Sequence, residues 1–241
     1  MDEAAPAPRL RDVQERMAQA AARAGRPADA ITLIAVTKTR RVATVRAALG
    51  LGLRHLGENR VQEALEKYAA PGAPGGDLVA RAGVTLHLIG TLQRNKARRA
   101  AAFFDAIDSV DRVDIARALD RAVAEASRPP LPVLIEVNVS GEASKSGVAP
   151  TGLAALADGV RACPHLAPRG LMTIAPLGAP EAELRRCFAR LRVLRDGLAA
   201  HDPAAGWAAL SMGMSDDYEA AILEGSTEVR LGTALFGPRS P

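Results

Sequence analysis

The sequence predicts a single (β/α)8 barrel of the α/β class, preceded by an N-terminal helix. Short apolar segments of strand type alternate along the chain with segments of helical periodicity, a pattern typical of βαβ units and a parallel sheet. Eight such repeats within 241 residues match the usual size of a closed barrel. No shift in composition divides the chain, so we expect one domain over residues 1–241. An open doubly wound sheet is the alternative architecture.

The elements are expected to follow one another in a regular order. The first is an amphipathic helix over residues 10–24, and the Ala/Pro-rich residues 1–8 before it are expected to be disordered. The predicted strands are 31–36, 53–57, 85–89, 106–110, 133–139, 166–172, 208–212 and 229–231. The predicted helices are 42–49, 61–68, 94–103, 113–126, 153–162, 181–200 and 218–224. The Pro/Gly-rich stretches 71–76 and 127–132 predict connecting loops.

Composition excludes several classes of protein. Only two cysteines occur, without CxxC spacing or a Cys/His cluster, which argues against a disulfide scaffold or a metal site. The chain starts without the features of a signal peptide, and no apolar run reaches the roughly 20 residues of a membrane span. We therefore expect a cytoplasmic protein that does not associate with membranes. The 31 basic residues are scattered among 27 acidic ones and aromatic content is 3%, so nucleic-acid binding is not expected.

Lys38 is the most informative single residue. It follows the first predicted strand directly, at the mouth of a barrel where reactive groups gather. An amine at such a position is a candidate nucleophile for a Schiff base. Partial desolvation and the neighbouring cations Arg40 and Arg41 are expected to lower its pKa and favour the free amine. A solvated loop lysine is the alternative interpretation.

Two turns near the end of the chain have the composition of phosphate sites. The first contains Gly213 and Ser215, and the second contains Gly232 and Thr233. Glycine lets a backbone approach an anion, hydroxyl groups donate to it, and the N–H groups at a helix start favour negative charge. These turns follow the seventh and eighth predicted strands, where barrels commonly hold phosphate. A lysine that can form a Schiff base with an aldehyde, next to a phosphate site, suggests pyridoxal 5'-phosphate (PLP) as cofactor.

The residues at these positions carry a resemblance that extends along most of the chain. The motifs are AVTKT at 35–39, GENRVQE at 57–63, HLIGTLQRNK at 87–96, IDSVD at 107–111, VNVSGEASKSG at 137–147, GLM at 170–172 and LSMGMS at 210–215. In this order they resemble the PLP homeostasis protein family, which is related to the barrel domain of bacterial alanine racemases. The resemblance implies one PLP-bearing barrel without the additional β-domain of the racemases.

The resemblance also implies roles for individual residues. Lys38 would hold PLP as an internal aldimine, and Arg230 would face the pyridine nitrogen, where its permanent charge disfavours protonation of the ring. The phosphate would be held by Ser215, Gly232 and Thr233, and the cavity would be lined by Asn59 and Met212. No catalytic residue and no metal ligand is implied. The pattern departs from that of many relatives at Thr37, Arg60, Thr91 and Arg94, which leaves the details of the pocket rim open.

Three other side chains are candidates for further roles. His87 titrates near neutrality and is a possible acid or base, but its position on a predicted strand favours a packed histidine with satisfied hydrogen bonds. Lys96 and Lys145 are candidates to accept or relay free PLP, with solvated lysines as the alternative.

Two classes of function remain open, and a third is more distant. The resemblance implies a protein that binds and buffers PLP and delivers it to PLP-dependent apoenzymes. We also expect a monomer without robust catalytic activity. The alternative is a PLP-dependent amino-acid racemase, which needs a second base on the opposite face of the cofactor. The two tyrosines, Tyr68 and Tyr218, lie on predicted helices, where a structural role is favoured. A Schiff-base aldolase without cofactor would use the phosphate turns to bind a sugar phosphate.

Overall fold

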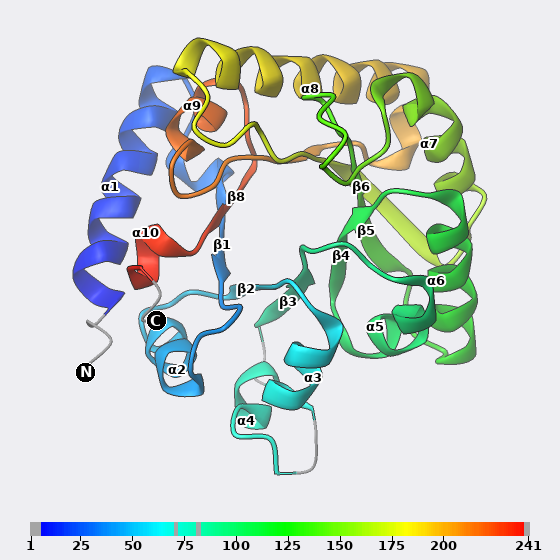
Figure 1. Ribbon diagram of the computed structural model, residues 1–241, viewed down its shortest axis with the longest axis horizontal. Coiled ribbons are helices and arrows are strands. Elements are labelled where there is room, and N and C mark those ends of the chain that lie inside the picture. Colours follow the sequence, from blue (N-terminus) through cyan, green and yellow to red (C-terminus); the bar gives the residue numbers. More distant parts are fainter. Residues whose placement is uncertain (1–5, 70–71, 81–82, 239–241) are drawn as a thin grey trace.

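Eight parallel strands form a closed barrel in the computed structural model, which describes residues 6–69, 72–80 and 83–238 (Figure 1). The strands pair in the order of the sequence, and β1 pairs with both β2 and β8. They are β1 Thr32–Val36, β2 His55–Glu58, β3 Thr85–Leu88, β4 Ala106–Val110, β5 Leu131–Glu136, β6 Leu166–Met172, β7 Ala209–Ser211 and β8 Glu228–Leu231. The predicted (β/α)8 barrel is confirmed, and the open doubly wound sheet is wrong.

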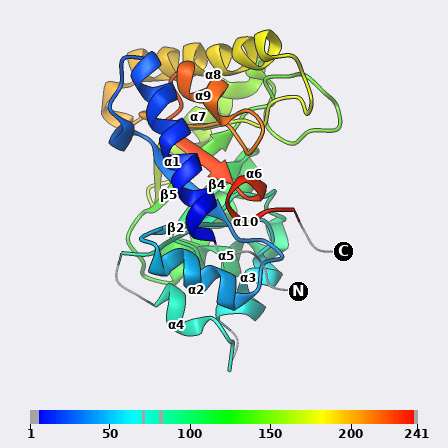
Figure 2. The same ribbon diagram turned by 90° about the vertical axis from the view of Figure 1, so that its left-hand side faces the viewer.

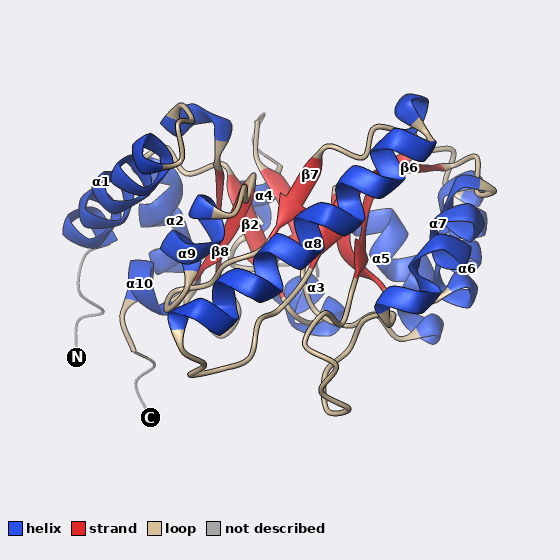
Figure 3. Ribbon diagram, turned by 90° about the horizontal axis from the view of Figure 1, so that it is seen from above, coloured by secondary structure: helices blue, strands red, loops and turns tan. Residues whose placement is uncertain are grey.

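Helices surround the strands on the outside of the barrel (Figure 3). The α-helices are α1 Pro6–Arg23, α2 Val42–Gly50, α3 Val61–Tyr68, α4 Gly76–Val79, α5 Ala97–Phe103, α6 Val113–Glu125, α7 Leu153–Arg161, α8 Glu181–His201, α9 Tyr218–Leu223 and α10 Thr233–Phe236. Short 3-10 turns cover Ala28–Ala30, Arg94–Lys96, Pro150–Gly152 and Pro203–Ala205. No helix among the described residues is long and apolar enough to cross a membrane.

The strands contribute apolar side chains to one continuous core. Ala35, Leu56, Leu88, Ile107 and Ile135 are fully buried on the strands, and the inner faces of the helices are rich in alanine and leucine. Small side chains let the helices pack closely on the barrel. Every strand can be buried on both faces because a helix layer covers the outside.

Helix α1 packs against α9 and α10, which closes one side of the barrel beside the β1/β8 seam (Figure 2). Its buried face includes Leu10, Val13 and Met17, spaced as an amphipathic helix requires. Arg16 forms an ion pair with Glu219 of α9. The first helix therefore supports the same region of the barrel as the last strands.

The structure differs from the predictions mainly at the ends of elements. Helix α1 begins at Pro6, so the expected disorder of residues 1–8 is wrong for residues 6–8, while residues 1–5 lie outside the described residues. Proline is well tolerated in the first turn of a helix because its missing N–H has no intrahelical partner there. Strand β5 ends at Glu136, three residues earlier than predicted, and β2 begins at His55. The helices α4 and α10 are additional elements.

Candidate functional site

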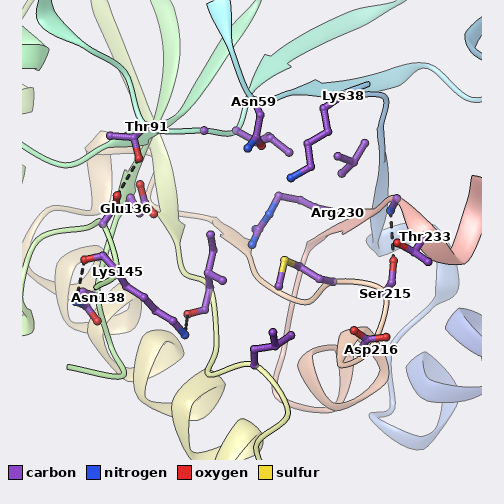
Figure 4. Close-up of a pocket in the computed structure, with 18 of the residues that line it drawn as sticks. Lys38, Asn59, Thr91, Glu136, Asn138, Lys145, Ser215, Asp216, Arg230 and Thr233 are labelled. Carbon is purple, nitrogen blue, oxygen red and sulfur yellow. Dashed lines mark hydrogen bonds between the residues drawn. The ribbon is translucent and has the colours of Figure 1, made fainter. Parts of the chain in front are cut away.

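A cavity of about 550 Å³ opens at the carboxyl ends of the strands. Its volume lies in the range of small-molecule sites. Side chains from seven of the eight strand ends or the loops that follow them reach it (Figure 4). The polar residues that line it are Lys38, Asn59, Thr91, Glu136, Asn138, Ser144, Lys145, Ser146, Ser215, Asp216, Arg230 and Thr233. Six of the seven residues predicted as site residues, Lys38, Asn59, Ser215, Arg230, Gly232 and Thr233, therefore share one cavity.

Lys38 enters this cavity from the loop that follows β1. The guanidinium group of Arg40, expected to influence the Lys38 pKa, is buried and donates to the carbonyl oxygens of Phe236 and Gly237. Arg41 precedes α2 and is exposed. The lowered pKa of Lys38 stays a prediction.

The two predicted phosphate turns meet at Ser215. Its Oγ accepts hydrogen bonds from the backbone N–H groups of Gly232, at 3.3 Å, and Ala234, at 3.0 Å. Gly213 has a φ of 97°, and a Cβ at this position would lie 2.7 Å from Cβ of Ala221. The close approach of α9 to the turn therefore requires glycine. Hydroxyl and N–H donors from the segments after two different strands thus meet at one place, which is the arrangement of an anion-binding site.

Arg230 lies on β8, lines the cavity and is only 3% exposed. It donates to Ser211 Oγ and to the carbonyl oxygen of Thr173, both at 2.8 Å. Burial lowers the pKa of Arg230, and the carboxyl groups of Asp108 and Glu136 oppose this effect. These bonds hold the guanidinium group in one orientation at the wall of the cavity.

Glu136 is a cavity residue that the sequence predictions did not include. It ends β5, it is 4% exposed, and its Oε2 has no hydrogen-bond partner among the described residues. Burial raises its pKa to about 7, the nearby Asp111 adds to the rise, and Arg230 opposes it. A single acidic residue inside the apolar run 133–137 was the signal that could have identified it. The carboxyl group can bind or release a proton near neutral pH.

The rim of the cavity opposite Lys38 is formed by the loops after β3 and β5. Thr91 Oγ1 and Ser146 Oγ lie 2.8 Å apart and join these loops. Asn138 Nδ2 donates to the carbonyl oxygen of Glu142 at 2.9 Å, which shapes the loop. Lys145 Nζ lines the cavity, donates to the Ala175 carbonyl oxygen at 2.8 Å and pairs with Glu142. Lys145 is thus an anchored rim residue.

Other predicted candidates lie outside this cavity. Met212 is fully buried in the hydrophobic core and does not line the cavity, whereas Met214 does. Lys96 ends a 3-10 turn and is not a lining residue. Tyr68 and Tyr218 are buried on α3 and α9, and neither lines the cavity.

His87 is packed with satisfied hydrogen bonds, as predicted. Its Nδ1 lies 3.0 Å from Asp108 Oδ2, and its Nε2 lies 3.0 Å from His55 Nδ1. Burial lowers the pKa of His87, but the nearby carboxylate of Asp108 raises it more, so the net shift of the pKa is upward. These residues border a second, smaller cavity of about 180 Å³ at the other end of the barrel, which Lys38 does not line.

Known proteins are similar to this chain in sequence and in fold. The family described as alanine racemase, N-terminal domain, matches residues 9–240. A pyridoxal phosphate homeostasis protein of Pseudomonas aeruginosa is 48% identical over 94% of this chain and 93% of its own length. The protein of the same name from Escherichia coli K12 is 43% identical over 95% of both chains.

Solved structures agree with this relationship. PipY of Synechococcus elongatus PCC7942 without PLP has a TM-score of 0.80 and 40% identity, covering 93% of this chain and 99% of PipY. PipY with PLP bound has a TM-score of 0.78, 38% identity and coverage of 93% and 100%. An alanine racemase of Clostridium difficile shares the fold, with a TM-score of 0.64, 12% identity and coverage of 88% and 53%. The chain belongs to the pyridoxal phosphate homeostasis proteins, within the family of the alanine racemase N-terminal domain.

Proposed function

We propose that this protein binds PLP and serves intracellular PLP homeostasis by buffering the cofactor and delivering it. The observation that carries the proposal is the convergence of an amine, Lys38, and a phosphate-type turn, around Ser215, in one cavity. The names of the relatives and the PLP-bound PipY structure support it.

The residues present fit PLP in three respects. Lys38 supplies the amine for a Schiff base with the aldehyde. Ser215, Gly232 and Thr233 supply the hydroxyl and N–H donors for a phosphate. Arg230 supplies a fixed cation for the pyridine nitrogen, and Asn59 borders the cavity between β2 and β3. When bound, PLP supplies a reactive carbonyl group and an electron sink.

Two features support a carrier over a racemase, and a third supports a monomer. A cation at the pyridine nitrogen keeps this nitrogen unprotonated, which weakens the electron sink. A racemase also needs a second base within reach of the substrate, and neither Tyr68 nor Tyr218 lines the cavity. Lys38 and the phosphate turn lie within one barrel, so a monomer contains both parts of the proposed site. We therefore propose a monomer that passes PLP to PLP-dependent apoenzymes and has no robust catalytic activity.

The colour of the protein tests the proposal. We expect protein incubated with PLP to be yellow, and borohydride to remove the visible absorbance and leave a pyridoxyl group on the peptide that contains Lys38. A colourless protein that instead forms a reducible adduct with a sugar phosphate would favour the aldolase. A pyridoxyl group found only on Lys96 or Lys145 would refute the assignment of Lys38.

A further inference from the structure

Two side chains of α3 hold the two peptide groups that flank Lys38. Lys67 Nζ donates to the carbonyl oxygen of Thr37 at 2.9 Å, and the N–H of Thr39 donates to Glu63 Oε1 at 2.5 Å. These are the peptide group before Lys38 and the peptide group after it. The backbone that carries the Lys38 side chain is thus held by a helix, in addition to the strand that precedes it.

A buried carboxylate connects these contacts to the barrel. Glu58 ends β2, is fully buried, and its Oε1 accepts hydrogen bonds from Thr37 Oγ1 at 2.8 Å, from Lys67 Nζ at 2.8 Å and from Tyr68 OH at 3.1 Å. A buried carboxylate is costly unless it is paired and hydrogen-bonded, and Lys67 provides the opposite charge. Burial and the charge of Glu58 raise the pKa of Tyr68, so this phenol keeps its proton and stays a donor.

The backbone beside Lys38 is strained. Thr39 has a φ of 62°, which is rare for a residue branched at Cβ. Such a conformation is unfavourable and persists only where the surroundings enforce it. The bond from the Thr39 N–H to Glu63 and the turn bond from the Arg40 N–H to the Thr37 carbonyl oxygen, at 3.0 Å, are contacts that enforce it.

We propose that Glu58, Glu63 and Lys67 are positioning residues that aim Lys38 at the carbonyl carbon of PLP; the proposal rests on the proposed role of Lys38. A lysine side chain is long and flexible, so its reactive nitrogen is placed only as well as its backbone is held. A misplacement of about 1 Å can slow a reaction by about a hundredfold. The three residues touch the backbone and side chain of Thr37 and the N–H of Thr39, and they act on PLP only through Lys38.

The test compares Lys67→Met, which keeps most of the alkyl stem but removes the donors, with Lys67→Arg, which keeps the charge and donors. Arg46→Met is a matched control, because Arg46 forms a comparable pair with Asp77 at the exposed surface. The first measurement is the rate at which PLP is trapped on Lys38 by borohydride, located by peptide mapping. The second is the pH dependence of Lys38 acetylation by acetic anhydride in protein freed of PLP, at a temperature where every variant is folded by circular dichroism.

We expect Lys67→Met to slow trapping on Lys38 by about tenfold or more and to shift the pH profile of acetylation, and Lys67→Arg to restore most of the rate. Arg46→Met should react at the wild-type rate. A purely structural role would lower the melting temperature but leave the trapping rate and pH profile of the folded protein unchanged. Glu63→Ala removes the contact to Thr39 at a more exposed position, and it decides the question if Lys67→Met does not fold.

The outcomes separate this proposal from the proposed function. If wild-type protein traps no PLP on Lys38, both proposals are overturned. If wild-type protein traps PLP but the folded variants at Lys67 and Glu63 trap it at the same rate, only the positioning role is overturned. Slow trapping in Glu63→Ala together with recovery in Lys67→Arg supports positioning.

Discussion

Ser215 lies in the loop that follows β7 and Ala234 lies in α10, which follows β8, yet the Ala234 N–H donates to Ser215 Oγ at 3.0 Å. This hydrogen bond joins the end of β7 to the first turn of α10 and gathers several donors of the proposed phosphate site around one hydroxyl group. In the proposed site, a bound phosphate would accept hydrogen bonds from these donors. The hydrogen bond between Ser215 and Ala234 already holds the two segments together. Binding of an anion should therefore cost little further conformational entropy.

Ser215→Ala or Thr233→Val should weaken the retention of PLP far more than that of pyridoxal. Each change removes one hydrogen bond to a charged group, a loss of roughly 1.5–3 kcal/mol, or about a ten- to hundredfold weaker affinity. Equilibrium dialysis with both ligands measures this difference, and pyridoxal is the internal control because it lacks the phosphate. An equal loss for both ligands would place the phosphate elsewhere.

Lys38→Ala should abolish the covalent bond to PLP and leave the fold intact. In the proposed site the Lys38 amine is the nucleophile, and its position at the mouth of the barrel contributes little to the core. Mass spectrometry after borohydride reduction should find no pyridoxyl group on the peptide with residue 38, while circular dichroism matches the wild type. Lys96→Ala is the matched control, since Lys96 does not line the cavity, and it should label as the wild type does.

The PLP-loaded protein should not racemise L-alanine at a rate near the 1–1000 per second that is typical of enzymes. At its proposed place beside the pyridine nitrogen, Arg230 would weaken the electron sink, and neither tyrosine lines the cavity to protonate the opposite face. Chiral chromatography measures the product, and a mixed assay with a PLP-dependent apoenzyme should show transfer instead. Rapid racemisation that disappears in Lys38→Ala would favour the enzyme.

Glu136→Gln should change how stability depends on pH. The ordinary pKa of glutamate is 4.5, and that of Glu136 is raised to about 7 in the folded protein. Between these values the unfolded chain releases a proton that the folded protein keeps, so stability from this group is full below pH 4.5 and is lost as pH rises to about 7. Glutamine does not titrate, so the free energy of unfolding of the variant relative to wild type should increase by about 2–3 kcal/mol from pH 5 to pH 8.

Urea unfolding at both pH values measures the effect at Glu136. Glu142→Gln is the control, because the neighbouring Lys145 lowers the pKa of this exposed glutamate, and its effect on stability has the opposite sign. A difference between Glu136→Gln and wild type that stays constant with pH would show that Glu136 is ionised throughout this range.

Periodicity and local composition were sufficient to predict the barrel and most of its mouth, but not every lining residue. Alternating apolar and helical segments do not depend on distant contacts, and strand ends of a parallel barrel must share one face. Met212 and Met214 have the same chemistry two residues apart, and only the path of the chain after β7 decides which faces the cavity. Helix α10 has four residues, too few for a periodic pattern to appear.

The network around Glu58 was beyond prediction for another reason. Its members are common polar residues, and Thr37, Glu58 and Lys67 become neighbours only when β1, β2 and α3 are assembled. Glu136 is different, because an acidic residue inside an apolar strand is visible in the sequence as an exception. Exceptions to a local pattern are therefore the more useful signal for a buried functional group.

The proposed cofactor site combines residues from both ends of the chain, because β1 pairs with β8. Lys38 follows the first strand, whereas Arg230 and Thr233 belong to the last strand and the helix after it. A nascent chain or a proteolytic fragment that ends before β8 has Lys38 and Ser215 but lacks Arg230 and the second proposed phosphate turn at Gly232 and Thr233. On the proposed assignment of the site, we expect such a fragment to react with an aldehyde but to retain PLP poorly. If PLP binds only the closed barrel, it stabilises that state relative to fragments and unfolded chains. On the proposed assignment, we therefore expect lasting yellow colour only in molecules that contain the last strand.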